Sequence, residues 1–256
     1  MVQRIGVSIR QMLSWNKAEK CLRCGGNKEG QEMFCIRCIE KIEQEEKERQ
    51  ERKREEYLMY EKEVLKNIGV PERYLDSAWE KSIIKGKERI MEMTKDGGCF
   101  YFVGIPGAGK TYAAVCVLRE WLRQETEGHE EKARLVILPE FFGNMRRYGK
   151  SQAWVNTEIA RKKILVLDEL GVSEQDYALE VLYNIINYRY NRPTRGFRTI
   201  ITSNLTLDEV KDRMHDRMSS RINEMATIVN FKAEDLRVKI KQEKYNGFRK
   251  RKEDIK

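Results

Sequence analysis

The sequence predicts an α/β fold with a mainly parallel sheet that is covered by helices on both faces. From about Gly69 onward, short apolar runs that suit buried strands alternate with longer amphipathic stretches. Parallel strands need long crossover connections, and the amphipathic stretches between the apolar runs can supply them as helices. The expected strands are Cys99–Val103, Arg134–Leu138, Ile164–Leu167, Thr199–Thr202 and Ala226–Phe231.

The clearest periodic stretch predicts a helix that begins at Ser173. Ser173 and Asp176 have the spacing of a capping box, in which side chains bond the free N–H groups of the first turn. Apolar residues then recur on one helical face, so the helix should pack one stripe against the sheet. The residues of that stripe are Ala178, Val181, Leu182, Ile185 and Ile186. A second helix is expected over Lys110–Gln124, after the first strand.

Length and composition are typical of a soluble globular protein. The 256 residues can build one full-sized core with a small appendage, and 40% of them are hydrophobic. No apolar run approaches the roughly 20 residues that cross a bilayer, and the first residues lack the apolar centre of a signal peptide. We therefore expect a cytoplasmic protein without a membrane partner. The net charge of +9 favours an anionic partner such as nucleic acid, although opposite charges are heavily mixed.

Composition changes twice along the chain and predicts three parts. Residues 1–40 contain a cysteine-rich module, residues 41–66 are almost wholly charged, and residues 67–256 carry the strand and helix pattern. The charged part has opposite charges four residues apart but lacks heptads, so a solvated helical linker is favoured over a coiled coil. The basic C-terminal tail, residues 239–256, contains two aromatic residues and could either contact nucleic acid or fray.

The stretch GIPGAGKT, Gly104–Thr111, predicts a phosphate-binding loop because it lies between an expected strand and an expected helix. Its glycines allow backbone N–H groups to curl around phosphates, and the start of the helix adds its dipole to the anion site. Lys110 can reach the β- and γ-phosphates, and the Thr111 hydroxyl can bind Mg²⁺. A glycine-rich turn that binds nothing is the alternative. The expected nucleotide-binding residues are Gly104, Ile105, Pro106, Gly107, Ala108, Gly109, Lys110, Thr111 and Tyr112.

Polar residues at the ends of two other strands predict a hydrolytic site. Asp168 ends an apolar strand, where it can hold Mg²⁺, and Glu169 is placed to polarise an attacking water. The alternative is an acidic pair that caps the following turn. Asn204 follows another apolar strand and could reach the γ-phosphate or the attacking water. Taken alone it is more often a turn residue, but beside the other two motifs the role at the site is favoured.

Three arginines are candidates for contact with phosphate. Arg217 and Arg221 are four residues apart, on one helical face, and a guanidinium from there could reach a neighbouring subunit's γ-phosphate. A solvated basic helix is the alternative. Arg237 follows the last expected strand and could act as a second phosphate sensor or have no role at the site.

Four cysteines near the N-terminus have the spacing of a zinc site. Cys21 and Cys24 form one CxxC pair, and Cys35 and Cys38 form a second after ten residues. Zinc would stabilise a segment that is too short to build its own core. A pair of disulfides and a redox CxxC motif are the alternatives, and the lack of a secretion signal disfavours the disulfides. Cys99 and Cys116 lie in apolar surroundings and are expected in the core.

From about Gly69 onward the chain resembles the DnaC/DnaI helicase loaders and their IstB transposition relatives, a clade of AAA+ ATPases. The resemblance rests on GVPERYLDSAW, GIPGAGKT, ILVLDELG, IINYRYNRP, TIITSNL and DRMSSRI. It implies an AAA+ ATPase domain over residues 67–256 with Walker A at Gly104–Thr111 and Walker B at Asp168 and Glu169. It also implies sensor 1 at Asn204, an arginine finger at Arg221 and sensor 2 at Arg237.

This resemblance implies ATP, Mg²⁺ and Zn²⁺ as cofactors and a switch of assembly state as the use of ATP. Loaders of this clade bind the replicative helicase and help to place it on single-stranded DNA. An arginine finger supplied by a neighbouring subunit makes hydrolysis depend on self-association. The zinc module would contact the helicase, or DNA as an alternative, in a bacterial or mobile-element setting. An IstB-like transposition helper on double-stranded DNA, and a regulatory P-loop module or nucleoside kinase, are the competing functions.

Overall fold

The computed structural model describes residues 20–27, 33–125, 127–148, 152–171, 176–214, 216–232, 235, 236 and 238. The proposed cap at Ser173, the candidate sensor Arg237, the basic tail and the N-terminal residues before Lys20 lie outside this set. The chain divides into two compact units, residues 1–59 and residues 60–256, which are described separately.

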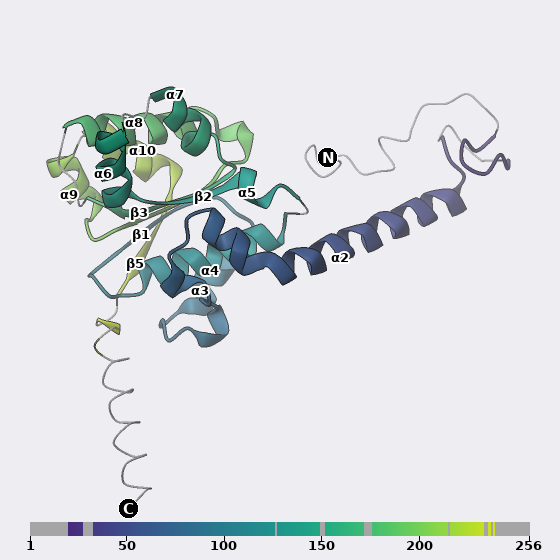
Figure 1. The fold of residues 1–256 in the computed structure, drawn as a ribbon, viewed down its shortest axis with the longest axis horizontal. Helices are drawn as coiled ribbons and strands as arrows, with labels where there is room; N and C mark the ends of the chain where they lie inside the picture. The colour runs from purple at the N-terminus through teal and green to yellow at the C-terminus, as the bar shows by residue number, and fades with distance from the viewer. Residues whose placement is uncertain are drawn as a thin grey trace, which may run out of the picture. The chain divides into compact units, whose positions relative to one another are not determined.

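A five-stranded parallel sheet forms the centre of the second unit (Figure 1). Its strand order is β2-β3-β4-β1-β5, and every neighbouring pair is parallel. The prediction of a parallel sheet is therefore confirmed. The strands are β1 (Cys99–Gly104), β2 (Ala133–Ile137), β3 (Ile164–Leu170), β4 (Arg198–Ser203) and β5 (Thr227–Phe231).

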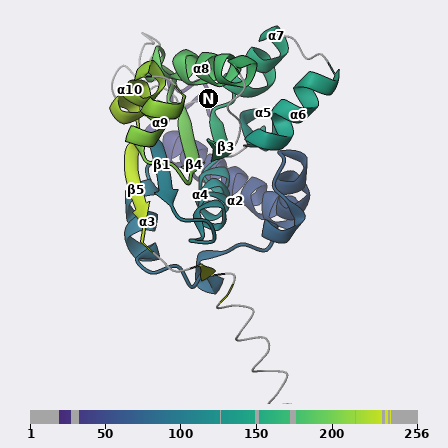
Figure 2. The same cartoon turned by 90° about the vertical axis from the view of Figure 1, so that its left-hand side faces the viewer.

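Helices cover both faces of this sheet, with α3 and α4 on one side and α6, α8 and α10 on the other (Figures 1 and 2). Side chains of successive strand residues point to opposite faces, so each strand contributes to two apolar layers. Leu165 and Leu167 of β3 lie in the cluster that includes Ile185 of α8 and Ile222 of α10, and all four are almost fully buried. The longer helices of this unit are α3 (Lys87–Thr94), α4 (Lys110–Arg123), α6 (Leu138–Tyr148), α8 (Asp176–Tyr190), α9 (Leu207–Arg213) and α10 (Asp216–Met225).

Shorter helical turns connect these elements. They are the 3₁₀ turns η2 (Glu72–Tyr74), η3 (Trp79–Lys81) and η5 (Pro193–Arg195), the short helices α5 (His129–Lys132) and α7 (Gln152–Val155), and a π-helical turn η4 (Asn156–Ala160).

The boundaries differ from the expected ones at two strands. β2 ends at Ile137, and Leu138 already begins α6, because Pro139 has a fixed φ that suits the first turn of a helix. β3 continues past Leu167 through the two acidic residues to Leu170, with an irregular register between Leu167 and Leu170. A β-bulge of this kind re-aims side chains, which is frequent next to functional sites.

The long helix α2 (Ile36–Asn67) begins in the first unit and ends in the second. Its charged middle forms local ion pairs such as Arg49 with Glu46 at 2.6 Å, which suits a solvated helix. Its last turns are different, because Leu65 is fully buried. Among the described residues, no helix is both long enough and apolar enough to cross a membrane.

Candidate functional site

The loop Gly104–Thr111 joins β1 to the first residue of α4. Gly109 caps the helix with φ 92°, a left-handed conformation that favours glycine because it has no Cβ. The free N–H groups at the start of α4 therefore face the loop, which makes an anion site. Gly107 also has a positive φ of 80°, and a Cβ there would lie 1.9 Å from the Asp235 carboxylate, so the loop and the segment after β5 approach closely.

The Lys110 ammonium group holds the loop and the neighbouring strand together. Its Nζ donates hydrogen bonds to the carbonyl oxygens of Gly104 at 2.7 Å and Ile105 at 2.8 Å. It also donates to Oδ1 of Asn204, 94 residues further along the chain, at 2.8 Å. The loop lysine and the residue after β4 are thus side by side.

Asp168 lies almost fully buried between two threonine hydroxyls. Thr111 Oγ1 donates to its Oδ1 at 2.9 Å, and Thr202 Oγ1 donates to the same oxygen at 2.6 Å. Burial raises the pKa of the Asp168 carboxyl and the adjacent Glu169 adds to the rise, while both hydroxyls oppose it. Hard oxygen ligands of this kind are those that Mg²⁺ prefers, so Thr111 and Asp168 fit the predicted magnesium site.

Glu169 has an unusual backbone conformation. Its φ of 64° makes it the non-glycine residue with positive φ among those described, and it lies within the irregular part of β3. Its N–H donates to Thr202 Oγ1 at 3.1 Å. Backbone strain of this type costs about 1–3 kcal/mol and is frequent at active sites. Glu169 lines a cavity beside the phosphate loop, while the adjacent Asp168 stays buried.

A cavity of about 350 Å³ opens beside the loop, a size typical of small-ligand pockets. Its walls include the predicted residues Pro106, Gly107, Gly109, Lys110, Thr111, Tyr112, Glu169 and Asn204. Gly104, Ile105, Ala108 and Asp168 do not line the cavity, although Asp168 is hydrogen-bonded to the lining residue Thr111. The Tyr112 hydroxyl donates to the Ala78 carbonyl at 2.9 Å, which fixes the ring against the segment before β1.

Several cavity residues are absent from the sequence prediction. They are Tyr74, Lys81, Ser82, Ile83, Ile84, Thr202, Ser203 and Leu236. Tyr74 lies in the stretch GVPERYLDSAW, which marks a resemblance but has no local chemical signature. Thr202 was interpreted only as the end of a strand, yet its place two residues before Asn204 is the signal that could have revealed it.

Arg221 and Arg217 lie away from this cavity, on α10. Both line a second hollow of about 650 Å³, formed by residues of α9 and α10 with Tyr190 of α8. The two hollows share no lining residue. Arg221 therefore does not join the other candidate catalytic residues of its own chain.

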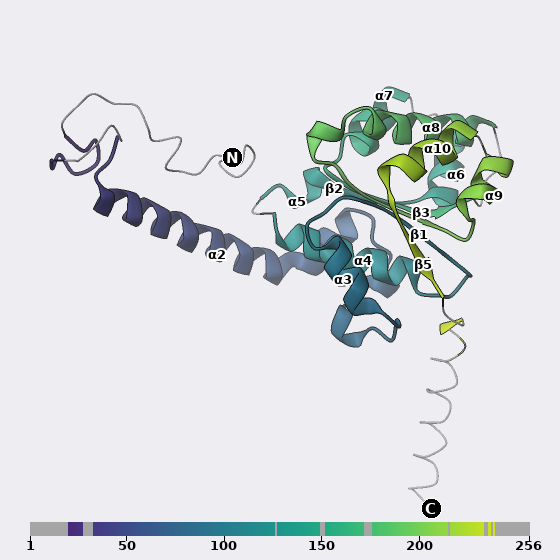
Figure 3. The same cartoon turned by 180° about the vertical axis from the view of Figure 1, so that it is seen from behind.

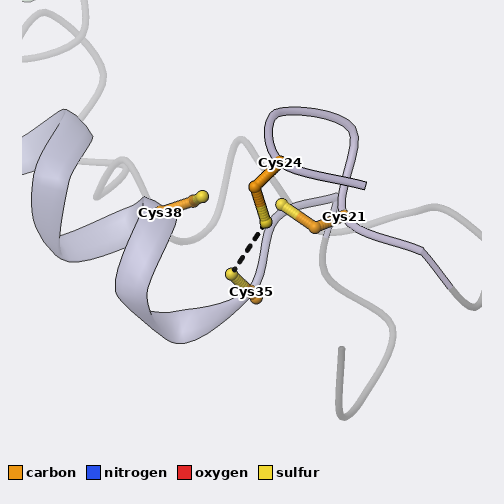
Figure 4. A group of neighbouring side chains, drawn as sticks. All are labelled: Cys21, Cys24, Cys35 and Cys38. Atoms are coloured by element: carbon orange, nitrogen blue, oxygen red, sulfur yellow. Dashed lines mark hydrogen bonds between the residues drawn. The ribbon is translucent and has the colours of Figure 1, made fainter. Parts of the chain in front are cut away.

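The four predicted cysteine ligands do come together in the first unit (Figure 4). Their sulfur atoms lie within 4.8 Å of one another, and none forms a disulfide. The Sγ atoms of Cys24 and Cys35 are 3.7 Å apart. Tetrahedral zinc with Zn–S bonds of roughly 2.3 Å separates its sulfurs by about 3.8 Å, so the cluster fits a zinc ion. Cys116 is buried in the second unit as expected, and Cys99 is half-buried.

A family model described as IstB-like ATP binding protein matches residues 26–244. No curated protein sequence matches the chain. Among solved structures, a crystal structure of the DnaC helicase loader aligns with a TM-score of 0.50 at 24% identity, covering 63% of this chain and 100% of that chain. A DnaI crystal structure aligns with a TM-score of 0.50 at 19% identity, covering 64% of this chain and 93% of that chain.

A structure of AMPPCP-bound DnaA from Aquifex aeolicus aligns with a TM-score of 0.52 at 17% identity, covering 71% of this chain and 57% of that chain. Identities this low show the fold alone. Together with the family match, the likeness confirms the predicted α/β fold with a parallel five-stranded sheet, like that of AAA+ P-loop domains.

Proposed function

The chain belongs to the family of IstB-like ATP binding proteins, which are P-loop ATPases, and we propose that it is a helicase loader that places the replicative DNA helicase on single-stranded DNA. The observation that carries this proposal is the presence of two sites in one chain. A cavity suited to a nucleotide is lined by Lys110, Thr111 and Asn204, and a separate four-cysteine cluster precedes it in the sequence. Structural likeness to the DnaC helicase loader and to DnaI supports the same assignment.

The residues around the cavity divide the work of ATP hydrolysis. The loop amides and Lys110 bind the phosphates, and Thr111 and Asp168 hold Mg²⁺, which supplies charge neutralisation when bound. Glu169 orients and polarises the attacking water from the strained turn of β3. Asn204, held by Lys110, senses the γ-phosphate. The Lys110 ammonium group has three donors, which are engaged by Gly104, Ile105 and Asn204, so binding of phosphate must replace one of these bonds. Loss of the Asn204 bond would link nucleotide state to the end of β4.

Hydrolysis then depends on self-association, because Arg221 does not line its own chain's cavity. A guanidinium delivered to a neighbour's γ-phosphate neutralises the charge that develops during transfer. A lone subunit lacks this group at its own site and should be a poor ATPase. Assembly on the helicase or on DNA would bring the subunits together and switch hydrolysis on.

The four-cysteine module, residues 1–40, is proposed to bind one zinc ion and to contact the helicase. Residues 41–66 act as a helical linker to the ATPase domain, residues 67–256. The protein would work in the cytoplasm of a bacterium or be encoded by a phage or mobile element. Binding of single-stranded DNA fits the net charge of +9, although charge alone does not distinguish DNA strands.

An IstB-like transposition helper on double-stranded DNA is the second candidate, because the matching family model is described as IstB-like. Such a helper would use the same ATP site to recruit a transposase. The two candidates predict different partners for the same chain, so a binding experiment separates them.

The test is co-purification of the full chain with the replicative helicase of the source organism, with and without ATP. We expect a complex with the helicase and faster helicase assembly on circular single-stranded DNA coated with single-strand binding protein. The control is Lys110→Ala, which should not support loading. ATP-dependent binding to double-stranded DNA with no helicase complex would instead establish the transposition helper.

A further inference from the structure

The guanidinium group of Arg221 rests on two tyrosine rings of the neighbouring helix. Tyr183 and Tyr190 are seven residues apart on α8, so both rings lie on one helical face. The guanidinium carbon of Arg221 is 4.8 Å from the centre of the Tyr183 ring and 5.5 Å from that of the Tyr190 ring. Both distances are within the roughly 6 Å range of a cation–π interaction. Figure 3 shows α8 and α10 side by side.

A carboxylate close to Arg221 in the sequence is engaged elsewhere. Glu224 is three residues after Arg221 on α10, a spacing at which an ion pair can form. Its Oε2 instead accepts a 2.6 Å hydrogen bond from the Tyr190 hydroxyl. Within the described part of the chain, Arg221 forms no ion pair, and its NH1 donates only to the Arg217 carbonyl at 3.3 Å. The guanidinium group of Arg221 can therefore form an ion pair with an anion from outside the chain.

The N–H groups of Arg221 also have few hydrogen-bond acceptors in the part of the chain that the structure describes. Its Nε is buried and has no hydrogen-bond partner among the described residues. This N–H group is not exposed to an incoming anion, but no acceptor in that part of the chain fixes the guanidinium group through it. Aromatic faces attract a guanidinium without using its N–H groups, whereas a carboxylate would occupy them. The rings thus hold the side chain without using the N–H groups of its two terminal nitrogens, of which NH1 donates, within the described ranges, only to the Arg217 carbonyl.

We propose that Tyr183 and Tyr190 are positioning residues that hold Arg221 ready for the γ-phosphate bound by a second copy of this chain, with Tyr190 also keeping Glu224 away. This inference rests on the proposed role of Arg221 as an arginine finger. A long side chain that is already ordered loses less entropy when it meets the phosphate, so the rings raise turnover rather than nucleotide affinity. Each ring interaction of about 1 kcal/mol corresponds to roughly fivefold in rate.

The test measures ATP turnover and ATP affinity of full-length variants at protein concentrations that span assembly. Tyr183→Leu should lower kcat about fivefold and leave ATP affinity unchanged, whereas Tyr183→Phe should keep the wild-type rate because its ring remains. Tyr190→Phe keeps the ring but releases Glu224, so kcat should fall. Adding Glu224→Gln to Tyr190→Phe should restore the rate, because no carboxylate then competes for Arg221.

The rescue in the double variant separates positioning from a merely structural role, since removing a second hydrogen-bonding partner would not repair a packing defect. If Tyr183→Leu fails to fold, the kcat values of Tyr190→Phe and of the Tyr190→Phe/Glu224→Gln double variant are sufficient to test the inference. Wild-type turnover in Tyr190→Phe, or no rescue by Glu224→Gln, overturns the inference while Arg221→Ala remains inactive. Unchanged turnover in Arg221→Ala would overturn the arginine finger itself, and the inference with it.

Discussion

The Thr202 hydroxyl donates a 2.6 Å hydrogen bond to Oδ1 of Asp168, joining the ends of β4 and β3 beside the phosphate loop. The same Thr202 oxygen accepts the N–H of Glu169 at 3.1 Å. One side chain thus fixes both acidic residues, and the proposed magnesium ligand and the proposed water-polarising group have a common support.

Thr202→Val should therefore impair hydrolysis, although Thr202 has no proposed contact with the reacting atoms. Loss of the hydroxyl leaves the buried Asp168 carboxylate with one donor fewer and releases the Glu169 backbone. We expect turnover to fall about tenfold, the effect of roughly 1.4 kcal/mol, and half-maximal activity to need more Mg²⁺. Steady-state assays over a Mg²⁺ series measure both effects. Thr202→Ser keeps the hydroxyl and serves as the control; equal activity of the Val and Ser variants would contradict this role.

Glu169→Gln should bind ATP and fail to hydrolyse it. The amide cannot act as a base toward water, while Lys110 and the loop amides are untouched. Binding of a fluorescent ATP analogue and phosphate release measure the two properties separately. Glu131→Gln changes an exposed carboxylate of α5 and should behave as wild type. Hydrolysis by Glu169→Gln at the wild-type rate would contradict the proposed role of Glu169 in polarising the attacking water.

The buried acid Glu61 should make stability depend on pH. Burial alone would raise the pKa of Glu61, but hydrogen bonds from Arg123 and Arg119 lower it below its ordinary value of 4.5. A lowered folded-state pKa stabilises the fold above the ordinary value, and this contribution is lost as the pH falls through the folded-state pKa. Glu61→Gln should lower the free energy of unfolding by about 1–3 kcal/mol at pH 7.

Urea unfolding of wild type and Glu61→Gln from pH 7 down to pH 3 checks this expectation. The difference between the two proteins should be constant above about pH 5 and shrink at lower pH, following the protonation of Glu61. Glu63→Gln, on the exposed face of the same helix, is the matched control. A difference that grows as the pH falls would contradict the ion pair.

The four-cysteine cluster should hold one zinc ion per chain. Metal analysis of protein purified without added zinc measures the stoichiometry. Cys35→Ser should lose the ion, because three thiolates cannot close a structural zinc site. Cys99→Ser should retain it, since Cys99 is not in the cluster. A stoichiometry near zero in the folded wild type, with four thiols open to reagent, would refute the zinc site.

Local sequence patterns predicted much of this fold and of the nucleotide site. Apolar runs located all five strands within a few residues, and the phosphate loop was placed between its strand and helix. Thr111 and Asp168 were each expected to bind Mg²⁺, and they form a hydrogen bond although they are 57 residues apart. These features could be predicted because buried strands appear as apolar runs and tight loops as glycine-rich stretches in the local sequence.

Features that depend on distant packing were not predicted. The strand order, with β1 between β4 and β5, has no local signature. The sequence places Thr202 at the end of a strand but does not show its bonds to Asp168 and Glu169, because those residues belong to a neighbouring strand. The cation–π contacts of Arg221 with Tyr183 and Tyr190 likewise depend on how α8 packs beside α10. Such contacts are set by tertiary structure.

The central claim, an ATP site completed by a second subunit, is tested most directly by mixing two inactive variants. Arg221→Ala should bind ATP normally and lose roughly 10³-fold in hydrolysis, the range for a lost arginine finger. Lys110→Ala should lose tight ATP binding but still offer its Arg221. Mixed assemblies contain sites with one intact half from each, so the mixture should recover part of the wild-type turnover. Turnover no higher than the sum of the two separate variants, despite demonstrated mixed assembly, would contradict a shared site.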